Sequence, residues 1–232
     1  MKNLLINIGK KSKKAFSNQI NSRKKDNILK DYYLLIEKNK KLILNENKKD
    51  IKNALKKKVK DNLIKRLILD DKKISDIINS IKKIIKLKDP TNIVLEKWKR
   101  PNGLNISKVS IPIGVIGIIY ESRPNVTSDV ASLCFKSGNP IILKGGSEAF
   151  YSNLILSKLF RKSLKKNKVD ENFIQFIDIK KRTVVDFLLT KMSRFIDVII
   201  PRGGKGLVKK VQDLSTVPVS YTHLTLPTMF EV

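Results

Sequence analysis

Residues 111–127 read IPIGVIGIIYESRPNVT, and the pattern of this stretch predicts the fold class. Its first part, Gly114–Ile119, is a continuous run of apolar and mostly β-branched residues, which is typical of a strand buried on both faces of a parallel sheet. A polar turn, Tyr120–Asn125, follows, and a helix is predicted over Ser128–Lys136. A buried strand, a polar turn and a helix form the first part of a β-α-β unit, so this stretch predicts an α/β fold.

The same alternation continues towards the C-terminus. Further strands are expected at Ile141–Lys144, Phe173–Ile177 and Asp197–Ile200. Helices are expected over about residues 147–166, 182–192 and 206–214. Because parallel strands joined by helices make right-handed crossovers, the pattern predicts an open, doubly wound parallel sheet.

The first hundred residues show helical periodicity instead. Apolar residues recur at helical spacing in two stripes, at Ile28, Leu29, Tyr32, Leu35 and Ile36, and at Ile74, Ile77, Ile78, Ile81, Ile84 and Ile85. Downstream, the turn signal Pro101-Asn102-Gly103 separates two short extended runs, Ile93–Trp98 and Leu104–Ser110, and predicts a hairpin. We therefore expect a helical N-terminal region at residues 1–100, and an α/β region with its preceding hairpin at residues 101–219.

The chain is strongly basic, with 49 Lys and Arg against 21 Asp and Glu and a formal net charge of +28. Such a charge suggests a nucleic-acid partner, and a basic nucleic-acid-binding protein is one alternative function. However, 41 of the cations are Lys and 8 are Arg, although Arg is the better reader of phosphate and guanine. Lys, Ile and Asn, which have A/T-rich codons, fill 91 of the 232 positions, so coding bias explains the excess. We expect no specific nucleic-acid partner.

The sequence also argues against a membrane protein, a disulfide-linked protein and a metal-binding protein. The sequence has no apolar run of about 18 residues, so no membrane partner is expected. A single cysteine, Cys134, rules out a disulfide framework and favours a reducing, cytoplasmic location. Cys134 stands between Leu133 and Phe135, an apolar setting that raises the pKa of a thiol, so we interpret it as a packed structural residue. No spacing of metal ligands is visible, and no metal is expected.

Three unusual segments follow predicted strands, and ligands bind at such strand ends in open α/β sheets. They are YESRPN at residues 120–125, KGGSE at residues 144–148 and PRGGKG at residues 201–206. Glycines let the backbone approach a ligand closely, and a following helix N-terminus attracts anions, so a nucleotide or phosphorylated ligand is indicated. The alternative is that each glycine pair is a plain tight turn. Neither a Walker A motif nor the G-x-G-x-x-G fingerprint is present.

Residues 111–127 resemble the signature stretch of gamma-glutamyl phosphate reductases, a family within the aldehyde dehydrogenase superfamily. The similarity continues through further motifs, at residues 133–139, 142–149, 200–207 and 215–219. It covers essentially residues 1–219. The resemblance implies an aldehyde dehydrogenase-like cofactor-binding domain with the doubly wound sheet.

The resemblance also implies an activity: NADPH-dependent reduction of L-glutamate 5-phosphate to L-glutamate 5-semialdehyde, with release of phosphate, in proline biosynthesis. In that reaction a cysteine thiolate attacks the acyl phosphate, and hydride from the cofactor reduces the resulting thioester. The implied partners are the small-molecule substrate, the cofactor NADPH/NADP and, for the full-length enzyme, a homo-oligomer. Another acyl-reducing aldehyde dehydrogenase is the second alternative, but the Glu121–Asn125 stretch argues against it, because general members carry Pro-Trp-Asn there.

The resemblance assigns the cofactor-binding residues to two of the three segments. Lys144 matches a lysine that contacts the adenosine ribose or the 2′-phosphate, and the rest of its motif, with Glu148 as the ribose-binding acid, lies beside it. The turn after the last strand matches the passage of the cofactor pyrophosphate. The implied cofactor-binding residues are Lys144, Gly146, Ser147, Glu148, Gly203 and Gly204.

The remaining segment, residues 120–125, carries the implied catalytic and substrate-binding residues. Asn125 matches the asparagine whose side-chain N–H stabilises the oxyanion, and Arg123 is a candidate for the phosphate or carboxylate of the substrate. Two alternatives stay open: Asn125 caps the helix that follows Pro124, and Arg123 forms a structural salt bridge with Glu121.

The last 13 residues, SYTHLTLPTMFEV, differ from the rest of the chain. They contain no Lys, Ile or Asn and do not resemble the family, so we interpret residues 220–232 as a non-native tail on a C-terminally truncated reading frame. His223, the only histidine, has no partner at a recognisable spacing. We therefore expect a fragment that lacks the catalytic domain and its nucleophilic cysteine and that has no reductase activity.

Overall fold

A computed structural model describes residues 1–181 and 183–221 of the chain. Within these residues, a sheet of four parallel strands has the order β5-β4-β3-β6. The strands are β3 (Ile116–Tyr120), β4 (Ile141–Gly145), β5 (Ile174–Phe176) and β6 (Val198–Arg202). Each predicted strand is present, with its ends within two residues of the predicted ones. Ile199 of β6 also makes an isolated parallel bridge to Val219 on its outer side.

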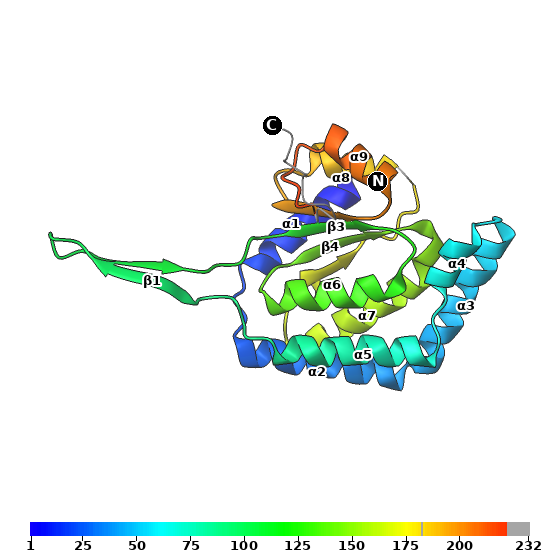
Figure 1. The fold of residues 1–232 in the computed structure, drawn as a ribbon, viewed down its shortest axis with the longest axis horizontal. Helices are drawn as coiled ribbons and strands as arrows, with labels where there is room; N and C mark the ends of the chain where they lie inside the picture. The colour runs from blue at the N-terminus through cyan, green and yellow to red at the C-terminus, as the bar shows by residue number, and fades with distance from the viewer. Residues whose placement is uncertain (182, 222–232) are drawn as a thin grey trace, which may run out of the picture.

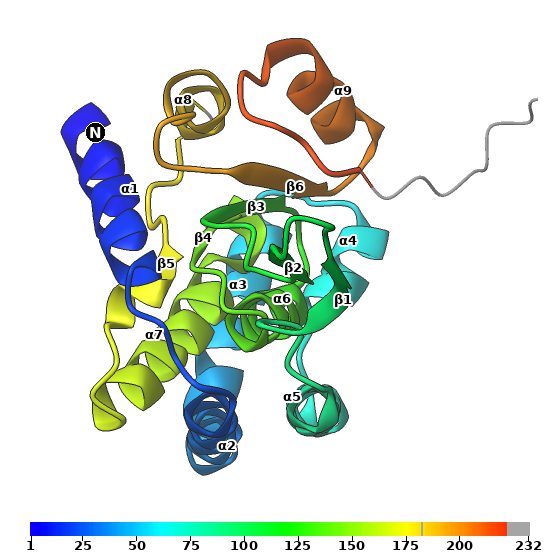
Figure 2. The same ribbon diagram turned by 90° about the vertical axis from the view of Figure 1, so that its left-hand side faces the viewer.

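Helices cover both faces of the sheet, which confirms the doubly wound prediction (Figure 2). One face carries α6 (Pro124–Lys136) and α7 (Phe150–Lys166), which also pack against each other. The opposite face carries α1 (Lys2–Phe16), α8 (Thr183–Lys191) and α9 (Lys205–Leu214). Two short 3-10 turns, η1 (Ser147–Ala149) and η2 (Glu171–Phe173), precede α7 and β5.

The central strand β3 shows why its sequence is apolar throughout. Ile116, Ile118 and Tyr120 point into the core beneath α6 and α7, whereas Ile119 points into the core beneath α1, α8 and α9. Every residue of β3 is buried. A strand that is buried on both faces needs apolar side chains at consecutive positions, as the sequence predicted.

The remaining N-terminal helices form a further layer behind α6 and α7 (Figure 1). They are α2 (Ser22–Lys38), α3 (Lys40–Lys56), α4 (Asp61–Leu67) and α5 (Asp71–Lys86). The isoleucine stripe of α5 and the apolar stripe of α2 are largely buried in the same core as the sheet, which confirms both predicted stripes. Since α1 packs on the other face, the helices of residues 1–100 lie on both sides of the sheet, and the domain boundaries stay a prediction.

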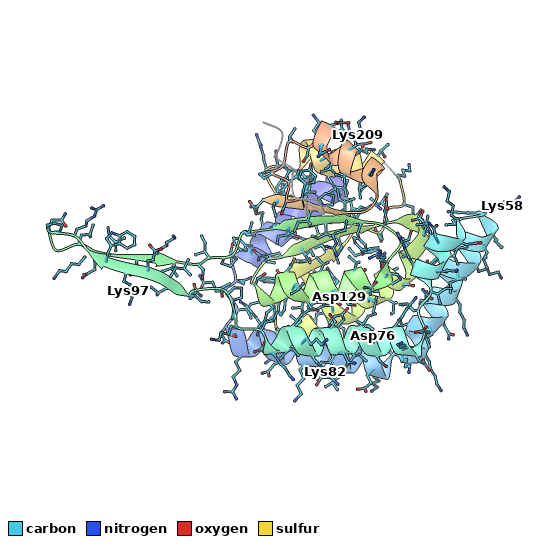
Figure 3. The ribbon with its side chains drawn as sticks, in the orientation of Figure 1. Lys58, Asp76, Lys82, Lys97, Asp129 and Lys209 are labelled. Carbon is cyan, nitrogen blue, oxygen red and sulfur yellow. The ribbon has the colours of Figure 1, made fainter. Side chains whose placement is uncertain are left out.

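The predicted hairpin is present as β1 (Val94–Lys99) paired antiparallel with β2 (Asn105–Val109). It projects from the body, and most of its side chains are exposed; Lys97 points into solvent (Figures 1 and 3). Gly103 adopts φ +87° in the connecting turn, a conformation that side chains with a Cβ rarely adopt. None of the described helices is long and apolar enough to cross a bilayer.

One helix boundary differs from the prediction and matters for the site. α6 begins at Pro124, four residues before the expected start at Ser128. The ring of proline presets the helical φ, and its missing N–H costs nothing in the first turn, so proline is favoured at this position. Asn125 therefore lies inside the first turn of α6 rather than in the preceding loop.

Candidate functional site

The three unusual segments meet at one end of the sheet. Tyr120, the last residue of β3, is in register with Gly145 of β4 and with Arg202 of β6. The loops that follow these residues therefore leave from the same line, which we call the carboxyl edge. β4 and β6 flank β3, so the strand order reverses here, and such a switch point is where open α/β sheets bind ligands.

The turn after β6 is in contact with Glu121 from the turn after β3. The backbone N–H of Gly204, which is the N-cap of α9, donates to Oε2 of Glu121 at 3.0 Å. A Cβ on Gly203 would lie 2.8 Å from Cδ of Glu121, so a larger residue at this position would displace the Glu121 carboxylate. An anionic ligand at Gly204 has to replace the Glu121 carboxylate as the acceptor.

The alternative that Arg123 pairs with Glu121 is wrong. Arg123 is exposed at the N-cap of α6, and its guanidinium has no ion-pair partner within the described residues. The Glu121 carboxylate is engaged by Gly204 instead. Arg123 therefore presents a cation at the carboxyl edge.

Asn125 does not cap α6, so that alternative is also wrong. The N-cap is Arg123, and the exposed Asn125 donates from Nδ2 to Oδ2 of Asp129, one turn later, at 3.2 Å. Burial raises the pKa of Asp129, and hydrogen bonds from Ser80 of α5 and from Asn125 lower it in part. Figure 3 shows Asp129 on α6, next to α5. Asp129 is not among the residues predicted from the sequence, although its i, i+4 spacing from Asn125 is a visible signal.

Lys144 lies at the end of β4 and is only 7% exposed. Its Nζ donates to the carbonyl oxygen of Gly145 at 2.8 Å. Burial lowers the pKa of the ammonium, while the charge of Glu148 raises it. Glu148 also accepts a hydrogen bond from the Ser147 hydroxyl at 3.1 Å, and Gly146 is the N-cap of η1. The structure thus brings the members of this motif together at the carboxyl edge.

A buried hydroxyl network supports this edge from below, and the sequence carried no signal for it. The hydroxyls of Tyr120 and Thr127 lie 2.6 Å apart, and Thr127 donates to Oδ1 of Asn153 at 2.9 Å. The three residues come from β3, α6 and α7, so the network holds both helices to the end of the central strand.

Cys134 is buried on α6, and burial raises the pKa of its thiol to about 12, which confirms the interpretation as a packed residue. The described residues contain no group of three or more His, Cys, Asp or Glu placed to hold a metal ion. His223 and most of the tail lie outside the described residues. Before them, Ser220 donates its N–H to the carbonyl of Ile199 in β6 at 2.9 Å.

Solved structures define the fold class. A probable aldehyde dehydrogenase from Listeria monocytogenes superposes with a TM-score of 0.68 at 15% identity, covering 94% of this chain and 45% of that protein. The fold is therefore that of the aldehyde dehydrogenases.

Closer relatives define the family. Gamma-glutamyl phosphate reductase from Clostridium tetani is 42% identical over 224 residues, 96% of this chain, and that from Nitratiruptor sp. is 47% identical over 212 residues, 90% of this chain. The crystal structure of gamma-glutamyl phosphate reductase from Thermotoga maritima superposes with a TM-score of 0.90 at 39% identity, covering 93% of this chain and 52% of that protein. No family model matches. The chain belongs to the gamma-glutamyl phosphate reductase family, and it spans about half the length of the curated relatives it matches.

Proposed function

We propose that this chain holds the nicotinamide cofactor of a reductase that converts L-glutamate 5-phosphate to L-glutamate 5-semialdehyde with release of phosphate. The observation that carries the proposal is the meeting of Asn125, Lys144 and the Gly203-Gly204 turn at the switch point of an aldehyde dehydrogenase-type sheet. Family membership supplies the substrate class.

The proposed cofactor is NADPH, and the donors at the carboxyl edge suit its charges. The ammonium of Lys144 is proposed to contact the adenosine ribose or its 2′-phosphate, together with Gly146, Ser147 and Glu148 of the turn that follows. The N-terminus of α9, at Gly204, can donate backbone N–H groups to the pyrophosphate after the hydrogen bond from Gly204 to the Glu121 carboxylate breaks. When bound, the cofactor supplies the hydride.

Asn125 is proposed to stabilise the oxyanion. Its Nδ2 carries two hydrogens, and one of them forms the hydrogen bond to Asp129. The second hydrogen is therefore available to donate a hydrogen bond to the reacting oxygen. Arg123, exposed one residue before α6, is proposed to bind the phosphate or carboxylate of the substrate through its two-pronged guanidinium.

Cys134, the only cysteine of the sequence, is not proposed as the nucleophile. It is buried within the core between α6 and the outer helices, and its pKa near 12 leaves almost no thiolate at neutral pH. We therefore expect this chain to bind cofactor without turning over substrate.

We also propose that the full-length enzyme is a homo-oligomer that uses the β1–β2 hairpin. Leu95 and Trp98 are among its exposed apolar side chains, and a two-stranded hairpin without a packed face is marginal in water. A second copy of the chain would cover these side chains. Sedimentation of the full-length enzyme and of its Leu95→Glu/Trp98→Glu variant tests this. The double variant should shift towards the monomer, and identical sedimentation of the two proteins would contradict the proposal.

The cofactor proposal is tested by titrating the purified chain with NADPH and with NADH, followed by calorimetry and cofactor fluorescence. We expect measurable NADPH binding, tighter than NADH binding, and no phosphate-dependent oxidation of glutamate 5-semialdehyde. If neither NADPH nor NADH binds, the assignment is overturned. Turnover that disappears in Cys134→Ser would overturn the exclusion of Cys134.

A further inference from the structure

A buried carboxylate caps α7 from another helix. Asp50, on α3, is 1% exposed. Its Oδ1 accepts the backbone N–H of Tyr151 at 3.0 Å, and its Oδ2 accepts the backbone N–H and the hydroxyl of Ser152 at 2.8 and 2.7 Å. The N-cap of α7 itself is Ala149, which has no side chain able to cap. The first turn of α7 is therefore closed by α3.

Asn47, one turn before Asp50, completes the network. Its Nδ2 donates to the Ser152 hydroxyl and to the carbonyl of Leu67, both at 2.9 Å, and its Oδ1 accepts the N–H of Leu69 at 2.8 Å. Both oxygens of Asp50 and both polar atoms of Asn47 have partners. A network that is satisfied in this way holds its elements in one arrangement.

The capped turn is continuous with the proposed cofactor site. η1 runs directly into α7, so the backbone that Asp50 holds is three residues from Glu148 and seven from Lys144. A second contact holds the same turn from the loop after β5: Nζ of Lys180 lies 4.2 Å from the ring centroid of Phe150. The position of η1 at the carboxyl edge thus depends on α3 as well as on the sheet.

We propose that Asp50 is a positioning residue for the cofactor site: by capping α7 from α3, it sets the turn that carries Gly146, Ser147 and Glu148 against the dinucleotide. This inference rests on the proposed function. A buried carboxylate is a costly way to cap a helix, and it is used here because the N-cap position is held by the fully buried Ala149, which has no capping side chain. The placement of the cap on α3 couples a helix outside the sheet to the binding turn.

Asp50→Asn tests the inference because the amide keeps the shape but turns one acceptor into a donor that faces a backbone N–H. The matched control is Asp89→Asn. Asp89 also accepts three hydrogen bonds, one from Lys25 and two from Thr91, but it lies before β1, at the opposite end of the sheet. NADPH affinity and urea unfolding are measured for both variants. We expect both to lose stability, and Asp50→Asn alone to bind NADPH roughly tenfold more weakly, which corresponds to about 1.4 kcal/mol.

Amide hydrogen exchange of residues 146–149 gives a second readout that needs no ligand. These amides should exchange faster in Asp50→Asn and unchanged in Asp89→Asn. Ser152→Ala, which keeps both backbone hydrogen bonds, serves if Asp50→Asn does not fold, and it should show a smaller effect of the same kind.

Equal NADPH affinities in the two Asp→Asn variants would overturn the inference and leave the proposed function standing. If the wild-type chain binds no dinucleotide, the proposed function fails. The exchange of residues 146–149 then decides by itself whether Asp50 orders the turn, and unchanged exchange in Asp50→Asn would overturn that as well.

Discussion

The two ends of the sheet differ in whether their cations are paired with carboxylates. At the amino edge, near the starts of β3 and β4, each buried lysine has a carboxylate partner: Lys25 lies 2.8 Å from Asp89, and Lys136 bonds the partly exposed Asp26. At the carboxyl edge, Arg123 is exposed, and the buried Lys144 bonds only a backbone carbonyl among the described residues. Paired buried charges hold elements together, whereas cations that lack a counter-ion in hydrogen-bond contact are left for a ligand. We therefore expect the ion pairs at the amino edge to contribute to stability and the cations at the carboxyl edge to contribute to ligand binding.

Lys25→Ala should show the largest effect and fall on stability alone. Removing the ammonium leaves the Asp89 carboxylate without its counter-ion in a largely buried site, which costs about 3 kcal/mol of unfolding free energy. NADPH affinity should stay within about twofold, because the site is at the far end of the sheet. Urea unfolding and calorimetry measure the two quantities. An affinity loss that matches the stability loss would show that the two edges are not independent.

Lys144→Met is the reverse experiment at the carboxyl edge. Methionine keeps an unbranched apolar stem and removes an ammonium whose burial is unfavourable, so stability should change by less than about 1 kcal/mol. NADPH affinity should fall about tenfold. If the ammonium meets the 2′-phosphate, the loss for NADH is smaller, and titration with both dinucleotides decides this. Unchanged NADPH affinity would remove Lys144 from the site.

The pH dependence of stability should separate the two edges by pH range: Asp89 acts in the acid range and Lys144 in the alkaline range, and in both ranges stability rises with pH. Burial raises the pKa of Asp89, but hydrogen bonds from Lys25 and Thr91 outweigh it, so the folded pKa is below the ordinary value. Its contribution is therefore present above about pH 4 and is lost as the pH falls through the folded pKa.

Lys144 has a lowered folded pKa, so the unfolded chain binds more protons in the alkaline range, and stability rises with pH between the folded value and about 10.4. Thermal melts between pH 3 and 10 check both ranges, with Asp89→Asn flattening the acid limb and Lys144→Met flattening the alkaline limb. A variant that flattens the other limb would contradict the assignment.

Glu121→Gln should give the smallest effect. Gln keeps an oxygen that can accept the N–H of Gly204, but it removes a negative charge from the place proposed for the pyrophosphate. NADPH should bind about threefold more tightly, a change of roughly 0.7 kcal/mol, and the gain should shrink at high salt. Weaker binding by Glu121→Gln would mean that the carboxylate contacts the ligand favourably.

Local patterns in the sequence determined the elements and the core. The apolar run of β3 and the isoleucine stripe of α5 each report on neighbouring residues, and burial followed as predicted. Cys134 is buried beside Phe135, although its other neighbour, Leu133, is 47% exposed. Because parallel strands end at a common edge, the sequence also predicted which three loops meet there. The start of α6 differs from the prediction because Pro124, which is favoured in a first helical turn, begins the helix four residues before Ser128.

Only the tertiary structure decided what each polar group at that edge contacts. Glu121 caps Gly204 instead of pairing with Arg123, and Asp50 caps a helix that begins 100 residues later in the chain. Such contacts join residues that are distant in sequence, and a hydrogen bond depends on a few tenths of an ångström, which no periodicity encodes. The pattern of apolar residues therefore determines the sheet and its edge, while the packing of the helices around it selects the partner of each charge.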